Sequence, residues 1–144
     1  MTIWVVVADS SRGRIYAQDE AGSPLREMFD LVHTGARLHG TELTSDRAGG
    51  HAGTSGTGTH ALDARTAAKQ HEAETFAREI AVRLEAGRTG GLFQHLVLVA
   101  PPAFLGELRG QLDAPLRRLV TTEVAKDLVM YPTDELRARL LQAT

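Results

Sequence analysis

The chain has 144 residues, which is the usual size of a single domain, and its 42% hydrophobic and 24% charged residues are typical of a globular protein. It has no cysteine, which excludes a disulfide framework and any zinc site built on thiolates. The net charge of −2 gives no overall attraction to nucleic acid, so contact with RNA would depend on a local basic patch.

The N-terminal region predicts three strands in an antiparallel meander. Ile3–Ala8 is a short β-branched apolar run that is typical of a buried strand, and turn residues follow it from Asp9 to Gly13. Arg14–Gln18 then forms a hairpin with the first strand, and Leu25–Leu31 adds a third. The first apolar run has only six residues and no basic leader, so we expect neither a signal peptide nor a membrane span, and a cytoplasmic protein without a membrane partner.

A long segment without periodicity follows the third strand. Within it, Ser45–His60 holds five glycines and two histidines. Loops of this length are unusual in a compact domain unless they are functional or disordered, so the segment is either a binding loop or a tolerated insertion.

A long amphipathic helix is predicted next, with Asp63 as its N-cap and Gly87 at its end. Its apolar positions recur at helical spacing and include Phe76, Ile80 and Leu84.

The C-terminal third predicts strand, helix, strand and helix. His95–Ala100 is the clearest buried strand, Ala103–Gln111 is a helix, and Leu116–Asp127 has strand-forming residues at its centre. Thr133 caps a last helix that runs through Leu141. A strand, helix and strand in series imply a right-handed crossover, so we predict a mixed α/β sheet of about five strands with flanking helices.

The glycine-rich segment has one motif-like feature, the spacing of Gly53 and Gly58, which is that of a phosphate-binding loop. The motif requires Lys and then Ser or Thr after the second glycine, but Thr59 and His60 stand there. The sequence therefore does not predict nucleotide binding through this loop.

The histidines and aspartates of the chain do not have the spacing of a standard metal or catalytic site. His51, His60 and His71 lack the helical spacing that places two imidazoles on one face. Four aspartates near the ends of elements could form a nuclease-like cluster, although turn and cap roles explain each of them: Asp9, Asp46, Asp63 and Asp127. No Gly-x-Ser-x-Gly elbow is present. We expect no metal, no cofactor and no catalytic residue.

Two arginines flank the first turn. Arg12 and Arg14 are either ordinary surface residues of a hairpin or part of a cationic face for phosphate, which Arg117 and Arg118 could extend.

Taken in order, the motifs resemble the bacterial host-attachment protein family over nearly the whole chain. The segments that carry the resemblance are "WVVVADSSRGRIY", "ELTSDRAGG", "GTGTHALDARTAAKQHEAETFAREIAVRL", "LVLVAPPAFLGELR" and "EVAKDLVMYP". That family is similar to the middle domain of archaeal and eukaryotic class-1 peptide release factors. The resemblance implies one ribonuclease H-like domain over residues 1–144, with a glycine-rich loop at residues 45–60.

In release factors, the corresponding loop carries a Gly-Gly-Gln motif that positions water for ester hydrolysis in the ribosome. Here Gly49 and Gly50 are followed by His51, and no Gln occurs before Gln70. The resemblance therefore implies a protein that binds ribosome or transfer RNA without releasing peptide.

The residues expected to contact RNA or a partner come from the hairpin, the loop and the start of the helix. They are Arg12, Arg14, Arg47, Gly49, Gly50, His51, His60, Arg65 and Lys69. Two alternatives stay open at this point: a small hydrolase or nuclease that uses the histidines and aspartates of the loop, and a protein-interaction module required for attachment to host cells.

Overall fold

The computed structural model describes residues 1–33 and 58–143. In the helix that begins at residue 58, it describes side chains only from residue 64 onward. Within these residues the chain forms one five-stranded sheet in the order β3-β2-β1-β4-β5. In chain order, its strands are β1 (Ile3–Ala8), β2 (Arg12–Gln18), β3 (Arg26–Val32), β4 (His95–Val99) and β5 (Val120–Val124).

The strand directions make the sheet mixed. β1 pairs antiparallel with β2, and β2 pairs antiparallel with β3, which confirms the predicted meander. β4 then returns parallel to β1, and β5 is parallel to β4. The predicted mixed α/β sheet of about five strands with flanking helices is confirmed, with β4 in its interior.

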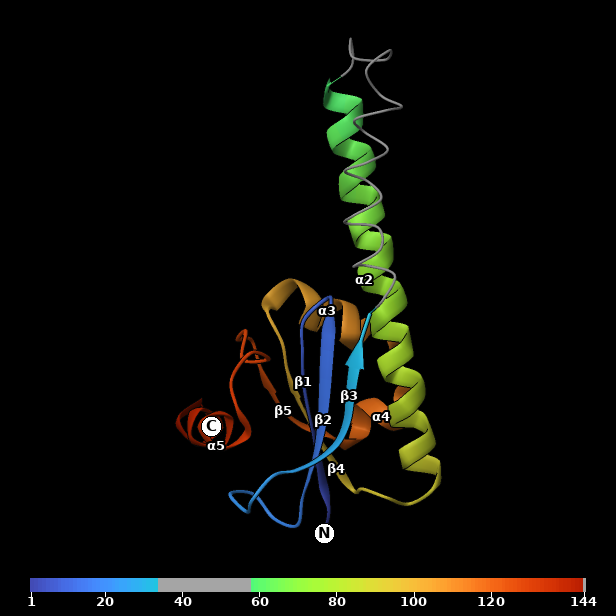
Figure 1. Cartoon of the computed structure of the whole chain (residues 1–144). Helices are drawn as coiled ribbons and strands as arrows, with labels where there is room; N and C mark the ends of the chain where they lie inside the picture. The colour runs from blue at the N-terminus through green and yellow to red at the C-terminus, as the bar shows by residue number, and fades with distance from the viewer. Residues whose placement is uncertain (34–57, 144) are drawn as a thin grey trace.

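Helices cover the two faces of the sheet unequally (Figure 1). They are α2 (Gly58–Thr89), α3 (Pro102–Gln111), α4 (Ala114–Leu119) and α5 (Thr133–Ala143). Successive side chains of a strand point to opposite faces, so Trp4 and Val6 pack with the residues of α2 and α3, while Val5 and Val7 pack with those of α5. All four of these β1 residues are buried, which explains the unbroken apolar run of this strand.

Two boundaries of α2 differ from the prediction. The helix begins at Gly58, so Gly58, Thr59 and His60 belong to α2 rather than to the glycine-rich loop, and Asp63 is an interior residue instead of the N-cap. Ala61 and Leu62 are good helix formers, which lets the helix extend upstream of Asp63.

No helix in the described part of the chain is long and apolar enough to span a membrane.

Gly87 lies inside α2 and does not end it. Its missing side chain instead leaves room for the ring of Trp4. A Cβ atom at this position would lie 2.6 Å from Cη2 of Trp4, closer than real contacts allow. The Trp4 ring stacks in turn on Phe93, with 4.6 Å between ring centroids. The helix ends only at Thr89, and Gly91, with a φ of 68°, turns the chain toward β4.

The sequence did not predict α4. The region Leu116–Asp127 contains the end of this short helix as well as β5. Asp113 is the N-cap of α4, and its Oδ1 accepts a hydrogen bond from the Leu116 amide at 3.2 Å. This cap places Leu116 in the core beneath α2 and α3.

Candidate functional site

α2 consists of two halves in very different surroundings (Figure 1). Its 32 residues correspond to a length of about 48 Å at the usual helical rise. The inner half, residues 72–89, packs on the sheet through Phe76, Ile80 and Leu84, all fully buried. In the outer half, residues 58–71, most side chains from Ala64 onward are exposed. The outer half therefore stands clear of the sheet.

An interaction at the end of β3 fixes the point where the outer half leaves the body. His33 directly follows β3, and its Nε2 lies 2.6 Å from Oε2 of Glu72 on α2. The His33 ring also stacks on Phe76, with 5.1 Å between centroids, and its amide donates to the Ser11 carbonyl. His33 is 4% exposed, so this contact is part of the packed base of the helix. Sequence reasoning missed it, because the two partners are 39 residues apart.

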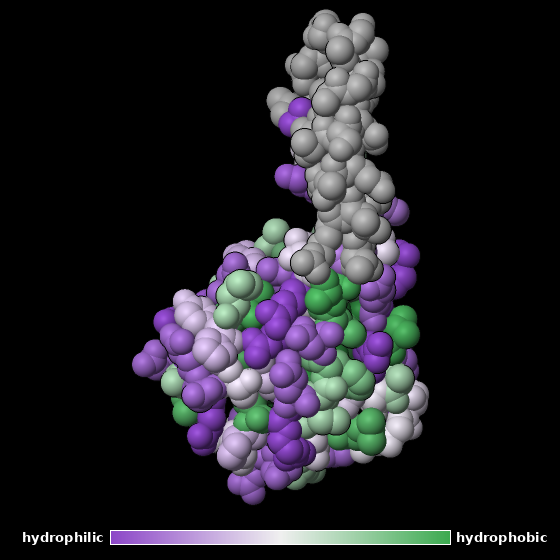
Figure 2. Space-filling model, viewed as in Figure 1, coloured by the Kyte–Doolittle hydropathy of each residue, from purple (hydrophilic) through white to green (hydrophobic). Residues whose placement is uncertain are grey.

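Two of the predicted contact residues lie together on the outer half. Arg65 and Lys69 are four residues apart and share one helix face. Lys69 is exposed, while Arg65 is half-buried and its buried Nε has no hydrogen-bond partner among the described residues. In Figure 2, hydrophilic side chains stand out from this projecting part of the helix. The pair can present two cationic groups to one anionic surface.

The predicted loop residues cannot be placed with them. Arg47, Gly49, Gly50 and His51 lie outside the described residues, and for His60 the structure describes only its helical backbone.

The hairpin arginines have separate environments. Arg12 donates from Nε and Nη2 to the two carboxylate oxygens of Asp30, at 3.1 and 2.9 Å, and its side chain is 36% exposed. This hydrogen bonding holds the pKa of Asp30 below its usual value and raises that of Arg12. Asp9 accepts hydrogen bonds from the amides of Ser11 and Arg12, which fixes the turn before β2.

Arg14 has a structural role. It is 7% exposed, and its Nη1 donates to the backbone carbonyls of Val129 and Tyr131, in the segment that leads to α5. Its guanidinium also lies 5.2 Å from the centre of the Tyr16 ring, and burial raises the pKa of that tyrosine. Internal carbonyls therefore accept hydrogen bonds from its guanidinium, and a contact of Arg14 with phosphate stays a prediction.

The described residues give little support to a metal-dependent or hydrolytic centre. No group of three or more His, Asp or Glu side chains within them is arranged to hold a metal ion. His71 is exposed on α2, and Asp9 is engaged in its turn.

Comparison with known proteins supplies the family. A family model described as "Protein required for attachment to host cells" matches residues 4–140. The chain belongs to this family. Among curated proteins, the uncharacterized protein RP470 of Rickettsia prowazekii (strain Madrid E) is 34% identical over 75 residues, a match that covers 51% of this chain and 50% of that protein.

Among solved structures, this host-attachment family member is similar to the archaeal translation termination factor aRF1. The superposition has a TM-score of 0.47 at 11% identity, and it covers 99% of this chain and 38% of the termination factor. The chain thus corresponds to only part of each of these relatives.

Proposed function

We propose that this protein is a translation-associated factor that binds the ribosome or transfer RNA through the outer half of α2. The observation that carries the proposal is the projection of this helix. Its exposed side chains begin at His71, directly beyond the Glu72 that contacts His33, and most side chains from there outward to Ala64 are exposed. A projecting helix about 10 Å across can enter a groove in RNA that the wider body of the protein cannot enter.

Arg65 and Lys69 supply the phosphate contacts in this proposal. Guanidinium and ammonium groups are the usual partners of phosphate oxygens, and such contacts carry affinity without reading sequence. Glu72 and Glu74 follow them on α2, and the whole chain has a net charge of −2. The attraction to phosphate therefore comes from only two neighbouring cations. We expect the binding constant to depend only modestly on salt concentration.

The proposal extends to the segment before α2, where Arg47, Gly49, Gly50 and His51 stay predictions from the sequence. Glycine permits close approach of the backbone to RNA. Because His51 stands where the release-factor motif has Gln, the proposed factor binds its target without hydrolysing peptidyl-tRNA. The proposal places the protein in the cytoplasm, where translation occurs.

Co-sedimentation with purified ribosomes over a salt series tests this function. The double variant Arg65→Gln, Lys69→Gln should pellet less, and the slope of log K against log salt should fall by about 1 for each lost contact. The matched control is Arg78→Gln, Lys126→Gln, which removes one exposed arginine from the inner half of α2 and one exposed lysine from the segment between β5 and α5. If both double variants pellet equally with ribosomes, or if the wild-type chain does not pellet, the proposal is wrong.

The family description supports a second candidate, a protein-interaction module needed for attachment to host cells. The same variants separate the two candidates. An attachment defect that follows the loss of ribosome binding in Arg65→Gln, Lys69→Gln would make attachment an indirect effect of translation. Normal attachment by a variant that no longer binds ribosomes would show that the two activities are separate.

A further inference from the structure

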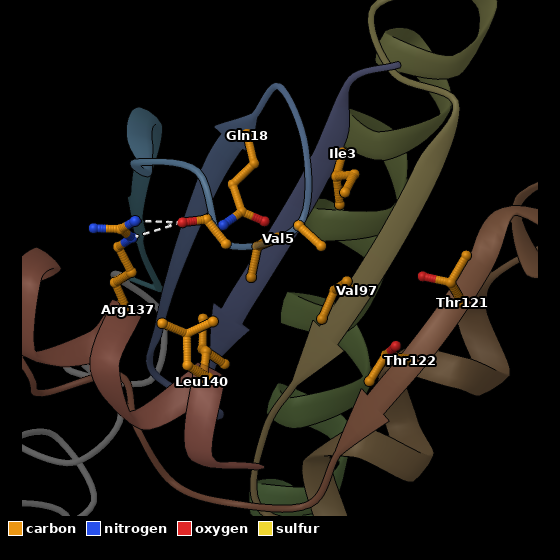
Figure 3. A pocket seen from close by; sticks show the side chains of 11 residues that line it. Ile3, Val5, Gln18, Val97, Thr121, Thr122, Arg137 and Leu140 are labelled. Carbon is orange, nitrogen blue, oxygen red and sulfur yellow. Dashed lines mark hydrogen bonds between the residues drawn. The ribbon is translucent and has the colours of Figure 1, made fainter. Parts of the chain in front are cut away.

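A cavity of about 250 Å³ lies between the sheet and α5, on the face opposite α2 (Figure 3). Ile3 and Val5 of β1 and Val97 of β4 form its apolar floor, and Leu140 and Leu141 of α5 form one wall. Val97 is only half-buried, although its β4 neighbours Leu96 and Leu98 are buried on the face that α2 and α3 cover. The cavity therefore leaves Val97 partly exposed, beside sheet residues such as Val5 that pack in the same cluster as α5.

One polar group is held in a fixed orientation beside this apolar floor. Gln18 is 8% exposed, and its Nε2 donates to the Ser23 carbonyl at 2.9 Å. That bond orients the carboxamide and leaves its Oε1 as an acceptor with no hydrogen-bond partner among the described residues. Figure 3 shows the carboxamide beside Val5, with Thr122 of β5 on the opposite side of the cavity.

The rim is fixed by a second set of hydrogen bonds. Arg137 of α5 donates from Nε to the Gly22 carbonyl at 3.0 Å and donates from Nη2 to the same oxygen. Gly22 has a φ of 86°, a backbone conformation that favours glycine, so the turn between β2 and β3 is held against α5. A cavity whose walls are tied together before binding loses little entropy when a ligand enters.

The lining selects the chemistry of the ligand. None of the described residues around the cavity is acidic, so a cation would have no counter-ion there. Two nitrogens of Arg137, the one lining cation, are already bonded to Gly22. Ligand sites are generally apolar with a few fixed polar groups, and this cavity follows that pattern at a small size.

We propose that this cavity binds a small, uncharged, largely apolar molecule with a single N–H or O–H group that donates to Oε1 of Gln18. Its apolar body lies on Val5 and Val97 against Leu140. The site is on the opposite face of the sheet from α2, so it does not depend on the proposed RNA contact.

Indole and 1-methylindole are suitable probes, because they share an apolar bicycle and only indole has an N–H donor. Each is titrated into the ¹⁵N-labelled full chain while amide shifts are recorded by NMR. Indole should shift the amides of Val5, Val97 and Thr122 and the side-chain NH₂ of Gln18, and it should bind several-fold more tightly than 1-methylindole, as expected for one hydrogen bond.

Two variants test the geometry. Gln18→Leu removes the acceptor at nearly constant side-chain volume, so the affinity for indole should fall to that for 1-methylindole. Val97→Phe fills the cavity and should abolish binding of both probes, whereas Val82→Phe, at an exposed position of α2, should leave binding unchanged. A well-dispersed spectrum verifies that each variant is folded. Equal binding of the two probes to the wild type, shifts outside the cavity, or no shifts at all would overturn the proposal.

Discussion

The two halves of α2 are one continuous helix, but different interactions stabilise them. In the inner half, Phe76, Ile80 and Leu84 are removed from water against the sheet. In the outer half, Ala64, Ala67 and Lys69 are exposed. A helix of about 15 residues is marginal in isolation, so the outer half depends on propagation from the anchored inner half. Helical periodicity alone therefore does not show which part of a helix belongs to the core.

The largest effect is expected from a cavity in the inner half. Leu84 is fully buried, so Leu84→Ala should lower the free energy of unfolding by about 2–5 kcal/mol, through lost burial and the void that is left. Gln70→Ala, at an exposed position of the outer half, should change it by less than about 0.5 kcal/mol. Chemical denaturation measures both. Similar losses for the two variants would show that the outer half is also packed.

At the boundary between the halves, His33→Ala should lower the free energy of unfolding by about 1–3 kcal/mol. It leaves a largely buried Glu72 carboxylate without its His33 partner, and it removes the ring that stacks on Phe76. A double-mutant cycle with Glu72→Ala isolates the pairwise coupling between the two side chains. Strictly additive losses would mean that the contact does not fix the base of the projecting helix.

Gly87 gives a prediction whose sign distinguishes packing from helix propensity. Gly87→Ala should destabilise the protein by about 1–3 kcal/mol, because the added methyl group overlaps Trp4. Gly106→Ala, within α3 and with no atom near the added methyl group, should instead stabilise the protein by about 0.5–1 kcal/mol. If Gly87→Ala also stabilises the protein, the close packing of α2 on Trp4 is wrong.

The smallest effect should come from the ion pair at the edge of the sheet. The pKa of Asp30 is lowered in the folded state by its hydrogen bond with Arg12, so its contribution is present above the ordinary carboxyl pKa and is lost as pH falls through the folded value. Both side chains are more than a third exposed, which limits this contribution to about 1 kcal/mol or less. The stability difference between wild type and Asp30→Asn should therefore shrink from pH 6 toward pH 3. A difference that grows on acidification would contradict this sign.

The order of the strands and helices, except for α4, could be predicted from the sequence, because hydrophobic period and turn residues are local signals. The apolar run at His95–Ala100 and the turn at Asp9–Gly13 are examples. The sequence wrongly predicts that Gly87 ends the helix, since a glycine that accommodates a distant ring looks the same in sequence as one that ends a helix. Asp113 and Pro115 are the local signals that could have revealed α4.

The candidate site was less predictable for the same reason. Arg12 and Arg14 are equivalent by residue type and spacing, but only the fold brings the carbonyls of Val129 and Tyr131 to Arg14. The contact between His33 and Glu72, and the exposure of Val97, likewise depend on elements that are distant in the sequence. The cationic pair of Arg65 and Lys69 could be predicted from the sequence, because helical spacing alone places both on one face.

Hydrogen–deuterium exchange of the protein, with and without ribosomes, tests the central claim about α2 most directly. In the free protein, amides of residues 64–71 should exchange much faster than those of residues 76–87, because exposed helix opens locally while the buried part requires larger unfolding. Added ribosomes should slow exchange in residues 64–71 and leave residues 76–87 unchanged. Protection confined to the sheet or to α5, with no change in the outer half, would contradict the account.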